Sequence, residues 1–186
     1  MNIRIISGEF GGRKILAPDG RTTHPMGDRQ RTALFNIIKA DLPGADVLDV
    51  FAGTGSLGLE ALSRGANSAT FIEKDRTAQR ILADNIKLLG VEDRAKLIRT
   101  TVSNWLDTSD SGEFDVIFAD PPYHDTQFST VERLFGLLKP GALMVLSQPG
   151  RSEVLTKTGV VVVDNRSYGN ANLVFYRRVE DKTETS

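Results

Sequence analysis

Cysteine is absent from the 186-residue chain, and histidine occurs only twice. A chain without cysteine forms no disulfides, has no thiolate metal sites and cannot use a cysteine nucleophile. Two histidines are too few for a histidine-rich metal centre, so we expect no metal site. Chemistry in this chain must come from oxygen-bearing and basic side chains and from the backbone.

Long hydrophobic runs are also absent. No stretch approaches the roughly 18 apolar residues that a membrane-spanning helix needs. The first residues lack the extended apolar region and small-residue cleavage site of a signal peptide. The 40% hydrophobic and 25% charged residues are the balance of a globular protein. We therefore expect one folded unit that is cytoplasmic and monomeric.

The small net charge of -1 hides an uneven distribution. Residues 1–39 carry a net charge of +4, whereas residues 40–186 carry -5. A basic segment on an acidic body favours a polyanionic partner at one end of the molecule. The alternative is a solvated surface whose charges are simply uneven.

The middle of the chain alternates between short apolar runs and stretches with helical periodicity. This alternation predicts an α/β fold with a mostly parallel sheet, preceded by a small β-hairpin and closed by two antiparallel strands. Asp28 is expected to cap the first helix. We divide the chain into a basic hairpin arm, a main domain and a flexible tail: residues 1–27, 28–179 and 180–186. The expected strands and helices are residues 3–7, 12–17, 28–42, 47–50, 55–64, 69–72, 76–89, 95–98, 114–119, 127–138, 142–147, 160–163 and 173–177.

A glycine-rich run, FAGTGSLG at residues 51–58, connects the first strand of the main domain to the following helix. Its glycines match G-x-G-x-x-G in the strand-to-helix context that gives this motif meaning. Glu73 follows Gly53 by twenty positions and ends the next strand, where a carboxylate can accept two ribose hydroxyls. The combination indicates a nucleoside cofactor; the alternative is a structural turn with a solvent-facing glutamate.

Asp49 helps to choose between a dinucleotide and S-adenosylmethionine. It lies near the carboxyl end of an otherwise apolar strand, just before the loop. A carboxylate there repels a pyrophosphate and suits the ammonium group of a methionine moiety. A simple capping role for Asp49 is the alternative.

A second motif, Asp120-Pro121-Pro122-Tyr123, ends the fourth strand of the main domain. In open α/β sheets, loops at the carboxyl ends of the strands meet in one crevice, so we expect this loop to face the glycine-rich run. The exocyclic amine of a nucleobase is a weak nucleophile and needs acceptors for both of its N–H bonds. The Asp120 carboxylate and the Pro121 carbonyl can accept them, while Tyr123 offers a ring for the base to stack on. The acceptors contribute mainly orientation and charge stabilisation, so no strongly shifted pKa is needed.

Together these motifs resemble those of class I S-adenosylmethionine-dependent methyltransferases, and the second resembles the loop of those that modify adenine or guanine amines. The N-terminal runs RIISG, GRK and DRQRTALFN, at residues 4–8, 12–14 and 28–36, are similar to those of the RsmD family, as are Pro25 and LGLEALSRGA at residues 57–66. That resemblance implies a Rossmann-like fold and methylation of the N2 amine of one guanine in bacterial small-subunit (16S) ribosomal RNA. It does not indicate whether the substrate is free RNA or an assembling particle.

The same reasoning assigns the site residues. Expected catalytic residues are Asp120, Pro121, Pro122 and Tyr123. Expected cofactor contacts are Asp49, Phe51, Ala52, Gly53, Thr54, Gly55, Glu73, Lys74, Thr101 and Val102. Expected RNA contacts are Arg4, Arg13, Lys14, Arg29 and Arg31.

Three of these assignments carry qualifications from the sequence itself. Tyr123 stands where the family often has phenylalanine, and we expect equivalent stacking. The run at residues 100–102 lacks the small polar or acidic residue that relatives place near the adenine, so backbone groups could supply that contact. Arg29 and Arg31 are two positions apart on the expected helix and point to different faces, so one of them could brace the cofactor pocket instead.

Three other functions remain open at this point. A nicotinamide-dependent oxidoreductase would use the glycine motif and Glu73 but leaves the Asp120 motif unexplained. A non-catalytic RNA-binding protein would not need that motif. A DNA adenine-N6 methyltransferase would need a separate domain to read DNA sequence, for which the chain is short.

Overall fold

The computed structural model describes residues 2–19, 26–108 and 111–180. A seven-stranded sheet in the order β5-β4-β3-β6-β7-β9-β8 forms its centre, and a two-stranded hairpin lies beside it. The strands from β3 to β7 are parallel, and β9 pairs antiparallel with β7 and β8. The strands are β1 (Asn2–Arg4), β2 (Lys14–Leu16), β3 (Asp46–Val50), β4 (Ser68–Ile72), β5 (Ala95–Ile98), β6 (Phe114–Ala119), β7 (Leu138–Pro149), β8 (Val160–Tyr168) and β9 (Ala171–Arg178).

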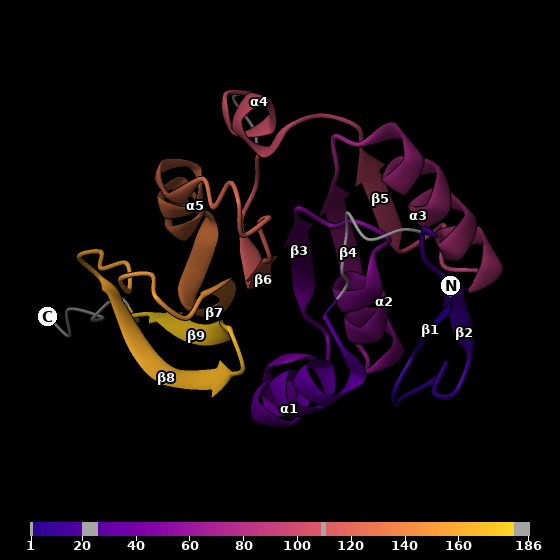
Figure 1. Ribbon diagram of the computed structural model, residues 1–186, viewed down its shortest axis with the longest axis horizontal. Coiled ribbons are helices and arrows are strands. Elements are labelled where there is room, and N and C mark those ends of the chain that lie inside the picture. The colour runs from indigo at the N-terminus through magenta and orange to yellow at the C-terminus, as the bar shows by residue number, and fades with distance from the viewer. Residues whose placement is uncertain (1, 20–25, 109–110, 181–186) are drawn as a thin grey trace, which may run out of the picture.

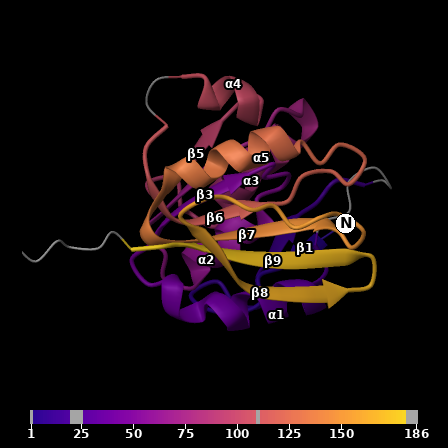
Figure 2. The ribbon, with the colours of Figure 1, turned by 90° about the vertical axis from the view of Figure 1, so that its left-hand side faces the viewer.

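Helices cover both faces of the sheet (Figure 1 and Figure 2). The helices are α1 (Asp28–Ile38), α2 (Ser56–Ser63), α3 (Arg76–Leu88), α4 (Val102–Leu106) and α5 (Phe128–Leu134), with short 3-10 turns at Lys39–Asp41 and Phe135–Leu137. Among the described residues, no helix is long and apolar enough to cross a membrane.

Neighbouring residues of the central strands bury their side chains on opposite faces. Val47 belongs to the core under α1, α2 and α3, whereas Leu48 belongs to the core under α4 and α5. Phe118 and Ile117 of β6 divide in the same way. Because successive strand residues point to opposite faces, a strand covered on both faces has to be apolar throughout.

The hairpin shares the core of the main domain. Ile3, Ile5, Phe10 and Ile15 belong to the same buried cluster as the side chains of α1 and α2. Residues 1–27 therefore do not form a separate folded unit in the part that the structure describes. The division of the chain at residue 27 therefore marks only the expected RNA-docking arm and no structural boundary.

Two buried side chains of α2 hold the segment between the hairpin strands. The carboxylate of Glu60, which has no exposed surface, accepts hydrogen bonds from the backbone N–H groups of Ile6 and Ser7 at 2.9 and 3.1 Å. The Ser63 hydroxyl accepts one from Phe10 N at 2.9 Å. Side chains of α2 therefore satisfy backbone N–H groups of the segment that joins the two hairpin strands.

Asn85 of α3 joins the hairpin to the loop after β3. Its Oδ1 accepts from Leu16 N at 2.7 Å, and its Nδ2 donates to Leu16 O at 2.9 Å and to Thr54 O at 3.0 Å. The Asn85 side chain is fully buried. Because it satisfies backbone groups of both segments, it fixes their relative position.

The structure departs from the expected elements in several places; one is β8, which runs to Tyr168, five residues beyond its expected end. Gly27, not Asp28, is the N-cap of α1, and no side chain caps it; Asp28 is the first helical residue and pairs with Arg31 and Arg4. Helix α4 was not expected; Thr101 caps it by accepting from Asn104 N at 3.0 Å. Strand β7 begins four residues early because the expected helix ends in a 3-10 turn at Leu137. The tail at residues 181–186 lies outside the described residues, as does Pro25.

Candidate active site

The two sequence motifs meet at the centre of the sheet. Strand β3 has β4 on one side and β6 on the other, so the chain changes direction across the sheet at β3. Val50, the last residue of β3, is in register with Ala119, the last residue of β6. The loops that follow are residues 51–55, called here the glycine loop, and residues 120–123, called here the proline loop. They leave the sheet side by side, at the type of position where open α/β sheets bind ligands.

The glycine loop is tied to the end of β4. The Glu73 carboxylate accepts from Gly53 N at 2.8 Å through Oε1 and from Asp75 N at 2.8 Å through Oε2. Each carboxylate oxygen has a second lone pair, so Glu73 can hold the loop and still accept ribose hydroxyls. Phe51 has a φ of 57°, a left-handed conformation that is rare for a bulky residue and is typical of functional turns.

The three glycines of the motif serve different purposes. A Cβ on Gly55 would lie 2.2 Å from Leu82 Cδ1, and one on Gly58 would lie 2.4 Å from Phe71 Cε1. Gly53 has a φ of 57°, and a Cβ there would meet nothing within 4 Å. Gly55 and Gly58 therefore allow close packing between elements, whereas bare backbone at Gly53 faces open space in which a ligand can lie.

Asp49 is buried beneath the glycine loop. Its Oδ2 accepts from Gly58 N at 3.0 Å, which satisfies one of the free N–H groups at the start of α2. Burial raises the pKa of Asp49 well above its usual value, the Gly58 hydrogen bond opposes the rise, and the charges of Asp120 and Glu73 add to it. The capping role that the sequence left as an alternative is present.

Three carboxylates thus lie within electrostatic reach of one another: the charges of Asp120 and Glu73 both act on Asp49. Their mutual repulsion is relieved by a ligand with positive charge and is increased by one with a pyrophosphate. S-adenosylmethionine carries a sulfonium and an ammonium group, and its charge suits this cluster of acids. A nicotinamide dinucleotide carries two phosphates, and its charge suits the cluster poorly.

The other expected cofactor contacts lie at the same edge of the sheet. Ala52 donates its N–H to Ile72 O at 3.0 Å, Thr54 is buried, and Lys74 is exposed beside Glu73. Thr101 and Val102 follow β5; Val102 is buried in the core, and the Thr101 hydroxyl is engaged in capping α4. The Thr101 hydroxyl accepts in this cap and still has its hydrogen to donate, so the expected adenine contact stays a prediction.

The proline loop presents one acid and one aromatic ring. Burial raises the pKa of Asp120 to about 6, with an opposing hydrogen bond from Ser147. Tyr123 is 41% exposed, yet its hydroxyl lies 2.8 Å from Ser147 Oγ. The role that the motif indicates for Asp120 does not require this shift. Its cause is the apolar strand ends on either side of the loop.

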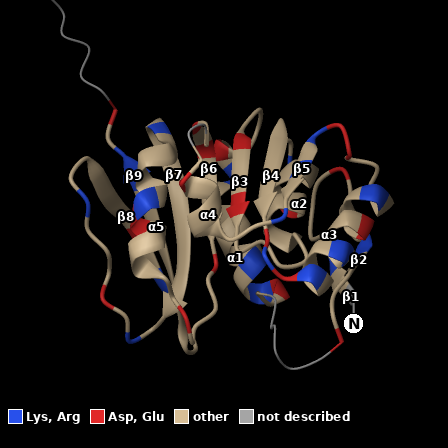
Figure 3. Ribbon diagram, turned by 90° about the horizontal axis from the view of Figure 1, so that it is seen from above, with Lys and Arg blue, Asp and Glu red and all other residues tan. Residues whose placement is uncertain are grey.

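Four of the five expected RNA contacts are exposed: Arg4, Arg13, Lys14 and Arg29. Arg4 and Lys14 belong to the hairpin and Arg29 to α1, and Figure 3 shows basic residues along the hairpin, α1 and α3, with acidic residues among them. Arg13 also has structural partners, since its Nη2 donates to Leu88 O at 2.9 Å and its guanidinium lies over the Phe10 ring.

Arg31 is the exception. Its side chain has no exposed surface; Nε donates to Met26 O at 3.1 Å and Nη1 donates to Arg4 O at 2.9 Å, while Nη2 pairs with Asp28. Burial lowers the pKa of Arg31, and the charges of Asp28 and Glu60 oppose that effect. The prediction that Arg31 contacts RNA directly is wrong, because the side chain is buried and its donors hold the backbone at Met26 and Arg4.

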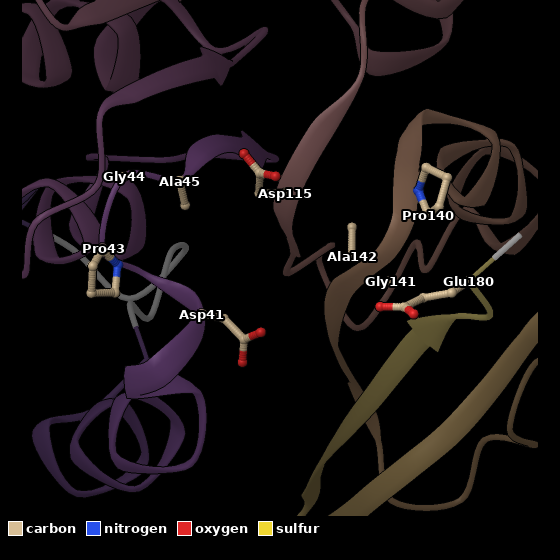
Figure 4. Close-up of a pocket in the computed structure, with 9 residues that line it drawn as sticks. All are labelled: Asp41, Pro43, Gly44, Ala45, Asp115, Pro140, Gly141, Ala142 and Glu180. Carbon is tan, nitrogen blue, oxygen red and sulfur yellow. The ribbon is translucent and has the colours of Figure 1, made fainter. Parts of the chain in front are cut away.

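A hollow of about 250 Å³ lies at the opposite edge of the sheet, between the amino-terminal ends of β3, β6 and the start of β7 (Figure 4). Its lining includes Asp41, Asp115 and Glu180. Arg177 pairs with Asp41 at 3.0 Å and Lys139 pairs with Asp115 at 3.1 Å, so two of these acids are neutralised. Among the described residues, no cluster of His, Cys, Asp and Glu could hold a metal ion.

Comparison with known proteins decides which family this arrangement represents. A family model described as Conserved hypothetical protein 95 matches residues 3–177. The chain belongs to this family. The match includes the hairpin, both loops and the antiparallel strands at the end of the sheet.

Named members of similar sequence share much of the chain. It is 33% identical over 183 residues to Ribosomal RNA small subunit methyltransferase D of Haemophilus influenzae, covering 94% of this chain and 92% of that protein. It is 40% identical over 121 residues to the protein of the same name from Escherichia coli strain K12, covering 65% and 60%. The solved structure of the Escherichia coli protein yhhF superposes with a TM-score of 0.88 at 31% identity, covering 97% and 100%. The resemblance to the RsmD family and the expected fold class are confirmed.

Sequence reasoning missed three polar residues that organise this site: Glu60, Asn85 and Ser147. Ser147 interrupts the apolar run ALMVL near the carboxyl end of β7, and a polar residue at that position is a usable signal. Asn85 lies on α3, whose exposed face also carries polar residues, whereas Glu60 lies on α2, which is buried along its whole length. Only the tertiary structure shows that they are buried.

Proposed function

We propose that this protein is an S-adenosylmethionine-dependent methyltransferase that modifies the exocyclic N2 amine of one guanine in bacterial small-subunit (16S) ribosomal RNA. The observation that carries the proposal is the placement of the proline loop beside the glycine loop, where β3 and β6 end in register. The relatives named above are small-subunit ribosomal RNA methyltransferases, which supports the RNA substrate. The cytoplasmic location and the monomeric state remain predictions that follow from this assignment.

S-adenosylmethionine supplies a methyl group on a positively charged sulfur. The residues that would hold it are Glu73 at the ribose, the backbone of residues 51–55, and Asp49 toward the ammonium group. One lone pair of Asp49 Oδ2 accepts from Gly58 N. The other lone pairs of this carboxylate remain for the ligand.

Asp120 prepares the amine for attack. Its carboxylate and the Pro121 carbonyl accept the two N–H bonds, which turns the nitrogen lone pair away from the ring and toward the methyl group. As the methyl group would pass from the sulfonium to the nitrogen, the C–S bond would break and leave a neutral thioether. The ionised carboxylate would stabilise the positive charge that develops on the nitrogen, whose surplus proton would then pass to the carboxylate or to water. Tyr123 stacks against the base and holds its plane fixed.

The proposed RNA contacts are the exposed cations of the hairpin and α1. Arg4, Lys14 and Arg29 can neutralise phosphates on the side of the molecule that carries the hairpin, and Arg13 can do so with the donors that Leu88 does not occupy. Arg31 contributes indirectly, because it fixes the backbone at Arg4 and at the start of α1.

Nucleoside mass spectrometry tests the proposal. The purified protein is incubated with methyl-labelled S-adenosylmethionine and either 16S RNA or small subunits that lack the modification. We expect labelled N2-methylguanosine. Labelled N6-methyladenosine would instead assign the protein to the adenine-modifying enzymes, and retention of labelled NAD in a filter assay would support an oxidoreductase.

A further inference from the structure

Ser147 lies directly beside the proline loop. Leu146 of β7 is in register with Ala119 of β6, so the next residue along each strand places Ser147 next to Asp120. Both side chains point to the face of the sheet that carries α1 and α2, which also carries Asp49. Only 4% of Ser147 is exposed. A hydroxyl buried at this position needs partners: it lies 2.8 Å from the Tyr123 hydroxyl, and the strand register places Asp120 beside it.

The hydrogen bonds around Ser147 have one consistent direction when Asp120 is ionised. Asp120 and Ser147 are neighbours at the ends of paired strands, and a carboxylate can only accept, so the Ser147 hydroxyl is placed to donate to an ionised Asp120. A serine hydroxyl has a single hydrogen, so Ser147 Oγ must accept from its other partner, 2.8 Å away. The Tyr123 hydroxyl is therefore the donor. Each hydroxyl thus donates to the next group in the series: Tyr123 donates to Ser147, and Ser147 donates to Asp120.

This chain of hydrogen bonds connects the two groups that address the target base. Tyr123 sits on an exposed loop, where an aromatic ring would otherwise sample several rotamers. Its hydroxyl anchors the far end of the ring to a buried strand residue. The same serine turns one face of the Asp120 carboxylate toward the sheet, which leaves the other lone pairs for a ligand.

We propose that Ser147 is a positioning residue of the methyl-transfer site, which holds the Tyr123 ring and the Asp120 carboxylate in one fixed arrangement. The role in the reaction rests on the proposed function, whereas the hydrogen-bond chain itself does not. The titratable groups that face Asp120 in the described structure are Asp49 of β3 and Tyr123 of its own loop. A change at Ser147 should therefore be transmitted to Asp120 in two ways, directly and through Tyr123.

The test uses Ser147→Ala, Tyr123→Phe, the double variant and Ser147→Thr. The first readout is the pH titration of Asp120, followed by carbon NMR of protein labelled in its aspartate side chains. Because the serine hydrogen bond favours the ionised acid, Ser147→Ala should raise the pKa of Asp120, and Ser147→Thr, which keeps the hydroxyl, should restore it. Tyr123→Phe should have a smaller effect, and the double variant should match Ser147→Ala, since the tyrosine acts through the serine.

The second readout is methyl transfer across pH. For Ser147→Ala we expect kcat to fall about fivefold at pH 6 and to recover near pH 8.5, where a raised KM for RNA remains because the Tyr123 ring is released. S-adenosylmethionine affinity, measured by calorimetry, should stay within twofold. An unchanged Asp120 titration in folded Ser147→Ala, or additive effects in the double variant, would overturn the proposal. If wild-type protein fails to methylate guanine, the proposed function fails, and the NMR titration still decides the role of Ser147.

Discussion

At the scale of single residues, Asp120 carries the clearest consequence for pH. Its pKa of about 6 lies within the range in which enzymes are assayed. The reaction needs the ionised carboxylate as an acceptor. We therefore expect the methyl-transfer rate at saturating substrates to fall tenfold for each pH unit below about 6 and to be level above about 7. A rate profile from pH 5 to 9 checks this, and an acid limb centred near pH 4 would contradict it.

The same shift has a cost for folding. A carboxyl group whose folded pKa is raised binds its proton more tightly in the folded than in the unfolded chain, so it lowers stability as pH rises from about 4 to about 6. Asp120→Asn removes the buried charge and keeps the size of the side chain. We expect it to stabilise the protein at pH 7.5 by up to about 3 kcal/mol while abolishing methyl transfer.

Urea unfolding at pH 7.5 and at pH 4 measures this effect. The stability gain should disappear at pH 4, where wild-type Asp120 is also largely neutral. Asp115→Asn, near the start of β6, serves as the control; because Asp115 pairs with Lys139, this change should not stabilise the protein at either pH. A gain of equal size at both pH values would show that the charge of Asp120 is not its cause.

At the scale of elements, the glycines of the motif have two separate roles: Gly58 in α2 allows close packing, and Gly53 leaves space for a ligand. Gly58→Ala places a methyl group 2.4 Å from the Phe71 ring, and we expect a loss of about 1–3 kcal/mol in the free energy of unfolding. Gly53→Ala meets no protein atom; the expected cost is about 1 kcal/mol from its positive φ, together with a larger loss of cofactor affinity. Unfolding and calorimetry of both variants distinguish the two roles.

Asn85 makes a prediction about two elements at once. Asn85→Ala leaves three backbone groups without their partner: the N–H and carbonyl of Leu16, and the buried carbonyl of Thr54. We expect faster amide exchange in the hairpin and also weaker S-adenosylmethionine binding, because Thr54 belongs to the glycine loop. Gln79, on the same helix, donates to Glu73 O at 2.8 Å, so Gln79→Ala is a matched variant that should leave hairpin exchange unchanged.

The elements also show what sequence alone could supply. The positions of Gly53, Glu73 and Asp120 follow from local motifs, because a strand-to-helix turn and a strand end fix them within a few residues. The roles of Arg31, Asn85 and Ser147 do not, because each depends on backbone groups or side chains from distant segments. The expectation that Arg31 contacts RNA came from charge alone, and charge does not reveal burial.

At the scale of the whole molecule, the basic side predicts how RNA binding responds to salt. Lys14→Ala with Arg29→Ala removes two exposed cations whose side chains have no part in the core. We expect weaker RNA binding and a salt dependence that is flatter by about two phosphate contacts, with unchanged S-adenosylmethionine affinity. Arg13 is avoided because its contacts with Leu88 and Phe10 also hold the hairpin.

A double variant at the far end of the molecule provides the control. Arg133→Ala with Lys157→Ala also removes two cations, from α5 and from the segment before β8. It should leave the salt dependence of RNA binding unaltered. Equal flattening by both double variants would mean that RNA responds only to net charge.

The burial of Glu60 beneath the hairpin limits how the molecule can be taken apart. A chain that starts after residue 17 would leave this carboxylate, Ser63 and Asn85 with unused hydrogen-bond capacity, on a surface that Ile5, Phe10 and Ile15 no longer cover. Such a truncation would lose solubility together with RNA binding, and the two losses would look alike. Conversely, a hairpin grafted onto another methyltransferase would pack there only if the new host supplied side chains equivalent to Glu60, Ser63 and Asn85.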